Sequence, residues 1–129
     1  MNNKRLPEIT KAQEDILKAV WDIENGAVAD VLENLPDPKP AYNTVATVIK
    51  VLEKKGYLGH KTYGKTNVYF ALLSRKEYAN HIIKDTFTGL FGGSLNQLVS
   101  PLLKNKEISL SELEELKNII ESEINKQKK

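Results

Sequence analysis

Few side chains in this 129-residue sequence are suited to catalysis or to metal binding. There is no cysteine, which excludes disulfides, thiolate nucleophiles and cysteine-based zinc sites. The two histidines, His60 and His81, are far apart in sequence, so no histidine metal site is expected. The neighbouring carboxylates Glu14 and Asp15 would point about 100° apart on a helix, which does not suit an acid–base pair. We therefore expect no catalytic residue, no metal and no cofactor, and infer that the protein is not an enzyme.

Positive charge is concentrated in the middle of the chain, although the net charge is only +2. Residues 1–38 hold four basic and eight acidic residues, and residues 76–129 hold eight of each. Residues 39–75 hold seven basic residues and a single acid, Glu53. A basic block inside a nearly neutral chain is typical of a surface that binds a polyanion. A lysine-rich face that only meets solvent is the alternative.

Three amphipathic helices are expected before residue 56. Apolar side chains recur at the helical period over residues 10–25, 27–34 and 42–55. Asn25 and Gly26 should end the first helix, because both residue types tolerate a positive φ. Three closely spaced prolines then predict an extended loop before the third helix.

A β-hairpin is expected after these helices. Residues 57–63 and 66–73 are rich in Tyr, Val, Phe and Thr, and Gly64-Lys65 between them suits a tight type II′ turn. Alternation in the second run predicts one buried face. Three helices followed by a basic hairpin indicate a winged helix-turn-helix, so the fold class is mainly α with a small hairpin. In that fold a recognition helix enters the DNA major groove, and the hairpin, or wing, reaches the adjacent backbone.

The third helix and the wing hold the residues that we expect to contact DNA. Thr44 and Thr47 suit contacts to base edges or nearby phosphates, whereas the lysines suit phosphates. Asn43 is alternatively a helix cap, and Tyr42 either caps the helix or packs on the sugar-phosphate backbone. A winged helix that contacts a protein in place of DNA remains the alternative function. The expected DNA-binding set is Tyr42, Asn43, Thr44, Ala46, Thr47, Lys50, Lys54, Lys55, His60, Lys61 and Lys65.

The remaining residues are expected to form amphipathic helices that need a partner surface. A second copy of the chain is the favoured partner, and packing against the winged helix of the same chain is the alternative. The predicted domains are therefore a DNA-binding domain, 1–74, and a helical dimerisation domain, 75–129. The residues expected at the dimer interface are Tyr78, Ile82, Phe87, Phe91, Leu98, Leu102, Leu113, Leu116, Ile120 and Ile124.

Two segments resemble the penicillinase repressor family. Residues 10–21, TKAQEDILKAVW, resemble the first helix of that family. Residues 42–57, which contain YNTVATVI and LEKKGY, resemble its recognition helix and the turn into its wing. The Phe91-Gly92-Gly93 break and residues 112–116 extend the resemblance over nearly the whole chain. It implies a winged-helix transcriptional repressor that binds a dyad-symmetric operator in double-stranded DNA as a homodimer and controls antibiotic-resistance or stress genes.

The chain also departs from the family pattern. Repressors of the β-lactam branch are released by proteolysis after an Asn-Phe pair, so the resemblance implies a regulatory protease as partner, but Pro101-Leu102 stands at that place. An arginine frequent late in the recognition helix is replaced by Val51 after Lys50. Lysine lacks the planar fork that reads guanine, so a different base preference is expected. Copper-responsive relatives carry a cysteine motif, and the lack of cysteine excludes that branch.

Hydropathy predicts no insertion into a membrane. The sequence has no run of about 18 apolar residues. Its first residues lack the apolar region of a secretory signal. The cytoplasm is therefore the expected compartment.

Overall fold

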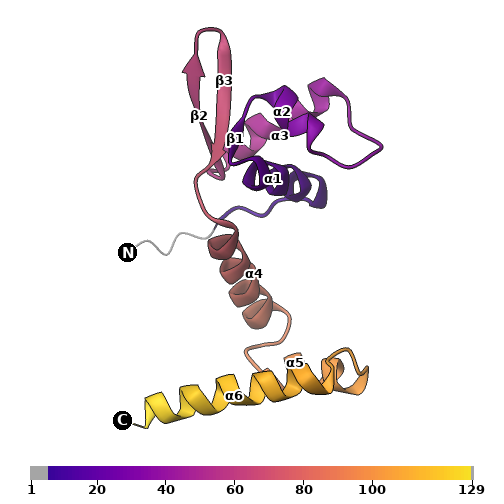
Figure 1. Cartoon of the computed structure of the whole chain (residues 1–129), viewed down its shortest axis with the longest axis vertical. Helices are drawn as coiled ribbons and strands as arrows, with labels where there is room; N and C mark the ends of the chain where they lie inside the picture. The colour runs from indigo at the N-terminus through magenta and orange to yellow at the C-terminus, as the bar shows by residue number, and fades with distance from the viewer. Residues whose placement is uncertain (1–5, 129) are drawn as a thin grey trace. The chain divides into compact units, whose positions relative to one another are not determined.

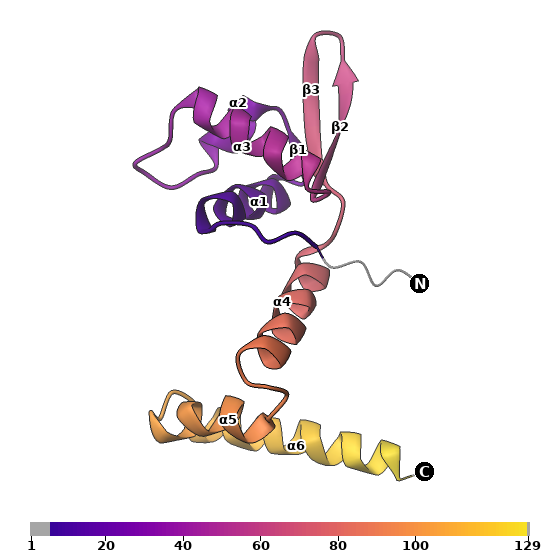
Figure 2. The ribbon, with the colours of Figure 1, turned by 180° about the vertical axis from the view of Figure 1, so that it is seen from behind.

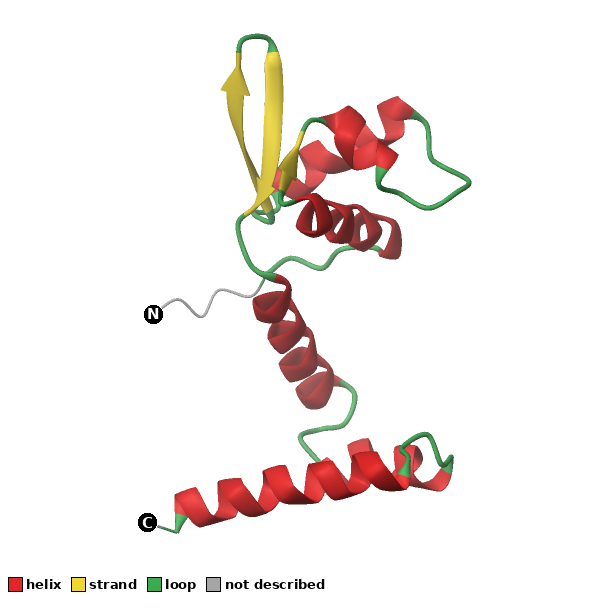
Figure 3. Ribbon diagram, in the orientation of Figure 1, coloured by secondary structure: helices red, strands yellow, loops and turns green. Residues whose placement is uncertain are grey.

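The structure of the chain, a computed structural model, describes residues 6–128 and is mainly helical with one small antiparallel sheet (Figure 1). It divides into two compact units, residues 1–80 and 81–129. This division falls six residues after the predicted domain boundary. Figure 3 shows the elements by type. They are α1 (Lys11–Ile23), β1 (Asn25–Gly26), α2 (Val28–Glu33), α3 (Tyr42–Lys54), β2 (Leu58–Tyr63), β3 (Thr66–Ala71), α4 (Arg75–Gly89), α5 (Leu95–Lys104) and α6 (Leu110–Gln127).

The first three helices enclose the core of the first unit. α1 begins at a capping box, in which Gln13 N–H donates to Thr10 Oγ1 at 3.1 Å and Thr10 N–H donates to Gln13 Oε1 at 3.0 Å. One apolar side chain or more from each helix is fully buried, as the helical period predicts. The largest of these are Leu17, Val20, Val31, Val45, Ile49 and Leu52. Tyr57 and Leu58, which follow α3, complete this part of the core.

The hairpin forms as predicted and extends away from the three helices in both views (Figures 1 and 2). Strands β2 and β3 pair antiparallel from Leu58↔Ala71 to Tyr63↔Thr66. Gly64 has a φ of 64°. Lys65 is not among the described residues with positive φ, so the turn matches type II′ and not type I′.

A third strand, β1, was not predicted. Its two residues pair with β3, so the sheet order is β1-β3-β2. The positive φ that ends α1 is at Glu24, 70°, and not at Asn25 or Gly26. Gly26 is needed for space, because a Cβ there would lie 2.7 Å from the Ile23 side chain. The sequence therefore located the end of α1, but the reason given for the glycine was wrong.

The sheet buries one face, but the apolar set in the alternation of residues 66–73, which is Val68, Phe70 and Leu72, is not on it. Leu58 and Tyr69 are 1% and 3% exposed and point toward the helices. Val68 and Phe70 point to the opposite face and are only half-buried. Tyr69 belongs to the core cluster, together with buried side chains of the three helices. The more apolar set of side chains in β3 therefore lies on the outer face of the sheet.

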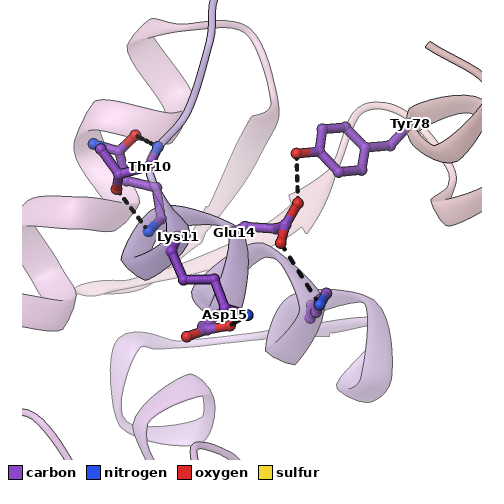
Figure 4. Close-up of polar contacts among 7 residues, drawn as sticks. Thr10, Lys11, Glu14, Asp15 and Tyr78 are labelled. Carbon is purple, nitrogen blue, oxygen red and sulfur yellow. Dashed lines mark hydrogen bonds and ion pairs between the residues drawn. The ribbon is translucent and has the colours of Figure 1, made fainter. Parts of the chain in front are cut away.

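The first turns of α4 belong to the first unit, which corrects the assignment of Tyr78 to a dimer interface. Tyr78 is 7% exposed, and its ring lies 5.6 Å from Trp21 and 6.0 Å from Tyr57. Its hydroxyl donates to Glu14 Oε2 at 2.8 Å (Figure 4). Burial, together with the Glu14 carboxylate, raises the pKa of Tyr78. This side chain therefore attaches the start of α4 to α1 within one chain.

The second unit consists of helices with little buried surface. α5 begins at Ser94, whose hydroxyl accepts from the Gln97 N–H, and it contains Pro101. α6 begins at a capping box between Ser109 and Glu112. The Ser109 N–H lowers the pKa of Glu112 by donating to its carboxylate. Neither α5 nor α6 has a buried side chain.

Candidate nucleic-acid interface

Helix α3 has one buried side and one polar side. Val45, Ile49 and Leu52 are fully buried and hold the helix against the core. The other side exposes the small polar and cationic residues that the sequence analysis selected, with Ala46 half-buried beside them. The exposed residues are Asn43, Thr44, Thr47, Lys50 and Lys54. Small side chains at the start of the helix and lysines toward its end allow a close approach to an anionic surface.

The N-terminus of α3 lacks a side-chain cap. Ala41 is the N-cap residue and makes no side-chain hydrogen bond, so neither Tyr42 nor Asn43 caps the helix. No acidic residue lies in the first turn. The first N–H groups of a helix have no partner within it, and together with the helix dipole they favour an anion. A DNA phosphate suits these donors, and Tyr42, which is 53% exposed, is next to them.

Lysines of α3 and the wing differ in their partners from several other cations of the first unit. Lys11, Lys18, Lys39 and Arg75 each form an ion pair with an acid. Within residues 6–128, Lys55 of the basic block has no ion-pair partner but is half-buried, and four other lysines of the block that have none are exposed. They are Lys50 and Lys54 of α3 and Lys61 and Lys65 of the hairpin. Their charge is available to an external anion.

Lys55 does not belong to this surface, which corrects the sequence prediction. Its Nζ donates to the Glu8 carbonyl oxygen at 2.8 Å and to Gln13 Oε1 at 3.2 Å. Nearby, the Tyr57 hydroxyl donates to the Pro7 carbonyl oxygen at 2.6 Å. These contacts hold the segment before α1 against the end of α3. Lys55 therefore has a structural role, because its ammonium group is held by the segment before α1 and by α1.

His60 connects the wing to the recognition helix. Its Nδ1 contacts the carboxylate of Glu53, and its ring lies 5.4 Å from that of Tyr69. Glu53 is the one acid of the basic block, so this contact occupies both groups. The phosphate contact predicted for His60 is not supported by this arrangement. His60, a residue of β2, contacts α3 through Glu53.

Lys61 and Lys65 lie at different places on the hairpin. Lys65 is in the turn at its tip. Lys61 pairs with Val68 and so lies on the outer face of the sheet, opposite to the face of His60. Thus the hairpin presents one lysine at its end and one on its side.

Comparison with known proteins places the chain in a family. The family model described as penicillinase repressor matches residues 9–122. The chain belongs to the penicillinase repressor family. It is therefore a DNA-binding transcriptional repressor with a winged helix, and not an enzyme.

Named relatives match this repressor over nearly its whole length. It is 27% identical over 126 residues to the penicillinase repressor of Bacillus licheniformis, covering 97% of this chain and 98% of the relative. It is 29% identical over 123 residues to the penicillinase repressor of Staphylococcus aureus, covering 93% and 95%. It is 26% identical over 121 residues to the methicillin resistance regulatory protein MecI of S. aureus strain N315, covering 93% and 98%.

Membrane-spanning helices and metal sites are absent from the described part of the chain. Among residues 6–128, no helix has the length and apolar character needed to cross a membrane. The described residues likewise contain no group of three or more His, Asp or Glu side chains placed to bind a metal ion.

Proposed function

We propose that the repressor binds a dyad-symmetric operator as a homodimer, with α3 of each copy in a major groove and each hairpin beside the adjacent backbone. The observation that carries this proposal is the polar side of α3. There, Lys50 and Lys54 have no acidic partner within residues 6–128, and the two threonines before them are exposed. A helix with this pattern fits the groove and its phosphates.

The side chains of α3 have different roles in this proposal. Thr44 and Thr47 contact base edges or the phosphates next to them, because their short hydroxyl side chains allow close approach. Lys50 and Lys54 bind phosphates, since an ammonium group cannot form the two parallel hydrogen bonds by which arginine reads guanine. Lys61 and Lys65 extend the phosphate contacts to the wing.

Exposed apolar side chains of the second unit support the homodimer. Ile82, Leu102 and Leu116 are 40%, 38% and 39% exposed, and Ile120 and Ile124 are 49% and 46% exposed. A chain that left so many large apolar residues in water would be prone to association. A two-fold dimer covers them and presents two reading heads to a symmetric operator. The interface that we propose contains Ile82, Phe87, Phe91, Leu98, Leu102, Leu113, Leu116, Ile120 and Ile124.

Names of the relatives support a role in antibiotic resistance. Two are called penicillinase repressors and one a methicillin resistance regulatory protein. We propose that this repressor also controls resistance or stress genes, in the cytoplasm where its DNA target lies. A regulatory protease that requires an Asn-Phe pair would cut this chain poorly, because α5 has Pro101-Leu102 at that place.

Fluorescence anisotropy with labelled promoter DNA from the repressor's own operon tests this proposal. We expect Lys50→Glu/Lys54→Glu to abolish specific binding. Lys76→Glu/Lys84→Glu on α4 makes the same change in net charge outside α3 and the wing, and it should leave binding within about threefold of the parent. Equal affinity of the α3 variant and the parent would contradict the proposal. Weak association that does not respond to salt would favour the protein-interaction module instead.

A further inference from the structure

The outer face of the sheet contains a pocket separate from the polar side of α3. Its volume is about 620 Å³, within the range of about 300–1,000 Å³ usual for small-molecule sites. All three strands contribute to it. It is lined by Asn25 of β1, Lys61 and Tyr63 of β2, and Val68 and Phe70 of β3.

Pairing in the sheet explains why these side chains meet. Asn25 is opposite Phe70, and Lys61 is opposite Val68, so all four lie on the same face. Gly59 is the other residue opposite Phe70. A Cβ at Gly59 would lie 3.2 Å from the Phe70 ring, although its backbone does not have the positive φ that requires glycine. Its lack of a side chain therefore leaves room for the Phe70 ring at the base of the pocket.

The lining combines an apolar floor with polar groups at its edge. Val68 and Phe70 are the half-buried apolar residues of the lining, which we take as its floor, and the exposed residues Asn25, Lys61 and Tyr63 carry its polar groups. None of the five lining residues is acidic, and Lys61 has no ion-pair partner among the described residues. The ammonium of Lys61 would repel a cation here. An apolar body that carries one carboxylate matches both the floor and the free ammonium.

We propose that this pocket binds a small amphipathic carboxylate and that its occupation weakens DNA binding by neutralising Lys61. The effect on DNA rests on the proposed function, because it requires Lys61 to contact the DNA backbone. Binding of the carboxylate does not depend on DNA. The two parts can therefore be measured separately.

Nuclear magnetic resonance titration of the full chain without DNA tests the binding site. The probe is 4-phenylbutyrate, and its neutral amide, 4-phenylbutyramide, is the control ligand. We expect saturable shifts of the Asn25, Lys61, Val68 and Phe70 backbone amide signals with the acid, and at least tenfold weaker binding of the amide. Lys61→Gln should weaken binding of the acid at least tenfold, whereas Lys65→Gln, in the turn, should leave it unchanged. No saturable shift, or equal binding of the acid by Lys61→Gln and the parent, would overturn the proposal.

The effect on DNA is measured by anisotropy at a 4-phenylbutyrate concentration that saturates the pocket. We expect the affinity of the parent to fall about fivefold to tenfold, as for the loss of one phosphate contact. Lys61→Gln should begin with a similar loss and then show no response to the acid. Unchanged affinity of the parent with a saturated pocket would overturn this part. If the parent does not bind DNA without the acid, the proposed function fails, and the titration without DNA still decides the pocket.

Discussion

Individual lysines of the first unit differ in whether they already form an ion pair with an acidic side chain. Lys18 lies 3.6 Å from Glu14, and such a pair must be broken before the lysine can bind a phosphate. Lys50 and Lys54 have no such pair in the described chain, so their contacts to DNA involve no loss of an existing interaction. An exposed pair is worth less than about 1 kcal/mol, but several lost pairs would lower the affinity substantially. The lack of ion pairs at Lys50 and Lys54 thus leaves both ammonium groups free to bind DNA phosphates at α3.

Thr44 and Thr47 give a prediction about specificity. Replacing both by valine removes two hydroxyl groups and preserves their volume. We expect affinity for the operator to fall by about 1 kcal/mol for each lost hydrogen bond, with little change for unrelated DNA. Anisotropy with both duplexes measures the difference, and Thr88→Val on α4 is the control. Equal losses on the two duplexes would show that these hydroxyls do not read the sequence.

Tyr78 gives a prediction about stability. Tyr78→Phe removes the hydrogen bond to Glu14, which we expect to lower the free energy of unfolding by about 1–2 kcal/mol in urea denaturation. Burial raises the pKa of Tyr78 above its ordinary value of 10.0, so the folded state holds this proton more tightly than the unfolded state. Stability of the parent should therefore fall as the pH rises above about 10, and less so for Tyr78→Phe. Equal losses of stability with rising pH in the parent and in Tyr78→Phe would contradict this role of Tyr78.

At the scale of elements, the helices and the hairpin could be predicted, because their patterns are local. Periodic apolar residues predicted α1 and α3, and Gly64-Lys65 predicted the turn. β1 could not be predicted, since a strand of two residues has no alternation and depends on pairing with β3. Long-range contacts also determine which site residues are available. Lys55 donates to the carbonyl oxygen of Glu8, which is 47 residues away in the sequence, and no local pattern indicates this contact.

The turn of the wing gives a prediction at this scale. Gly64 has a φ of 64°, and a Cβ there would have no atom within 4 Å. Any loss on substitution therefore comes from the backbone alone. We expect Gly64→Val to lower the free energy of unfolding by about 1–2 kcal/mol and Gly64→Asn to have a smaller effect. Thermal denaturation compares the two variants, and equal effects would show that the backbone conformation is not the cause.

At the scale of the whole molecule, the two units differ in how they bury apolar residues. The first unit has a closed core of fully buried side chains from α1, α2, α3 and the sheet. The helices α5 and α6 of the second unit bury none and expose leucine and isoleucine residues. We propose that a unit of that kind is stabilised by a partner. The sequence predicted that these helices need a partner surface. Tyr78 is buried within its own chain, so not every apolar residue of α4 is available to such an interface.

Oligomeric state is therefore a prediction for the whole molecule. Leu116→Glu/Ile120→Glu places two charges in the proposed interface, which we expect to convert a dimer to a monomer in sedimentation velocity experiments. Lys117→Glu, on the same helix, is the matched control and should remain dimeric. A parent protein that sediments as a monomer at micromolar concentration would contradict the homodimer. A double variant that remains dimeric would place the interface elsewhere.

We propose above all that α3 binds the DNA phosphates through Lys50 and Lys54. The most direct measurement is the dissociation constant for operator DNA as a function of salt concentration, for the parent and for Lys50→Gln/Lys54→Gln. Each phosphate contact contributes about 0.9 to the slope of log affinity against log salt. We predict that the magnitude of the slope falls by about 1.8 in the variant. A variant slope equal to that of the parent would contradict the claim.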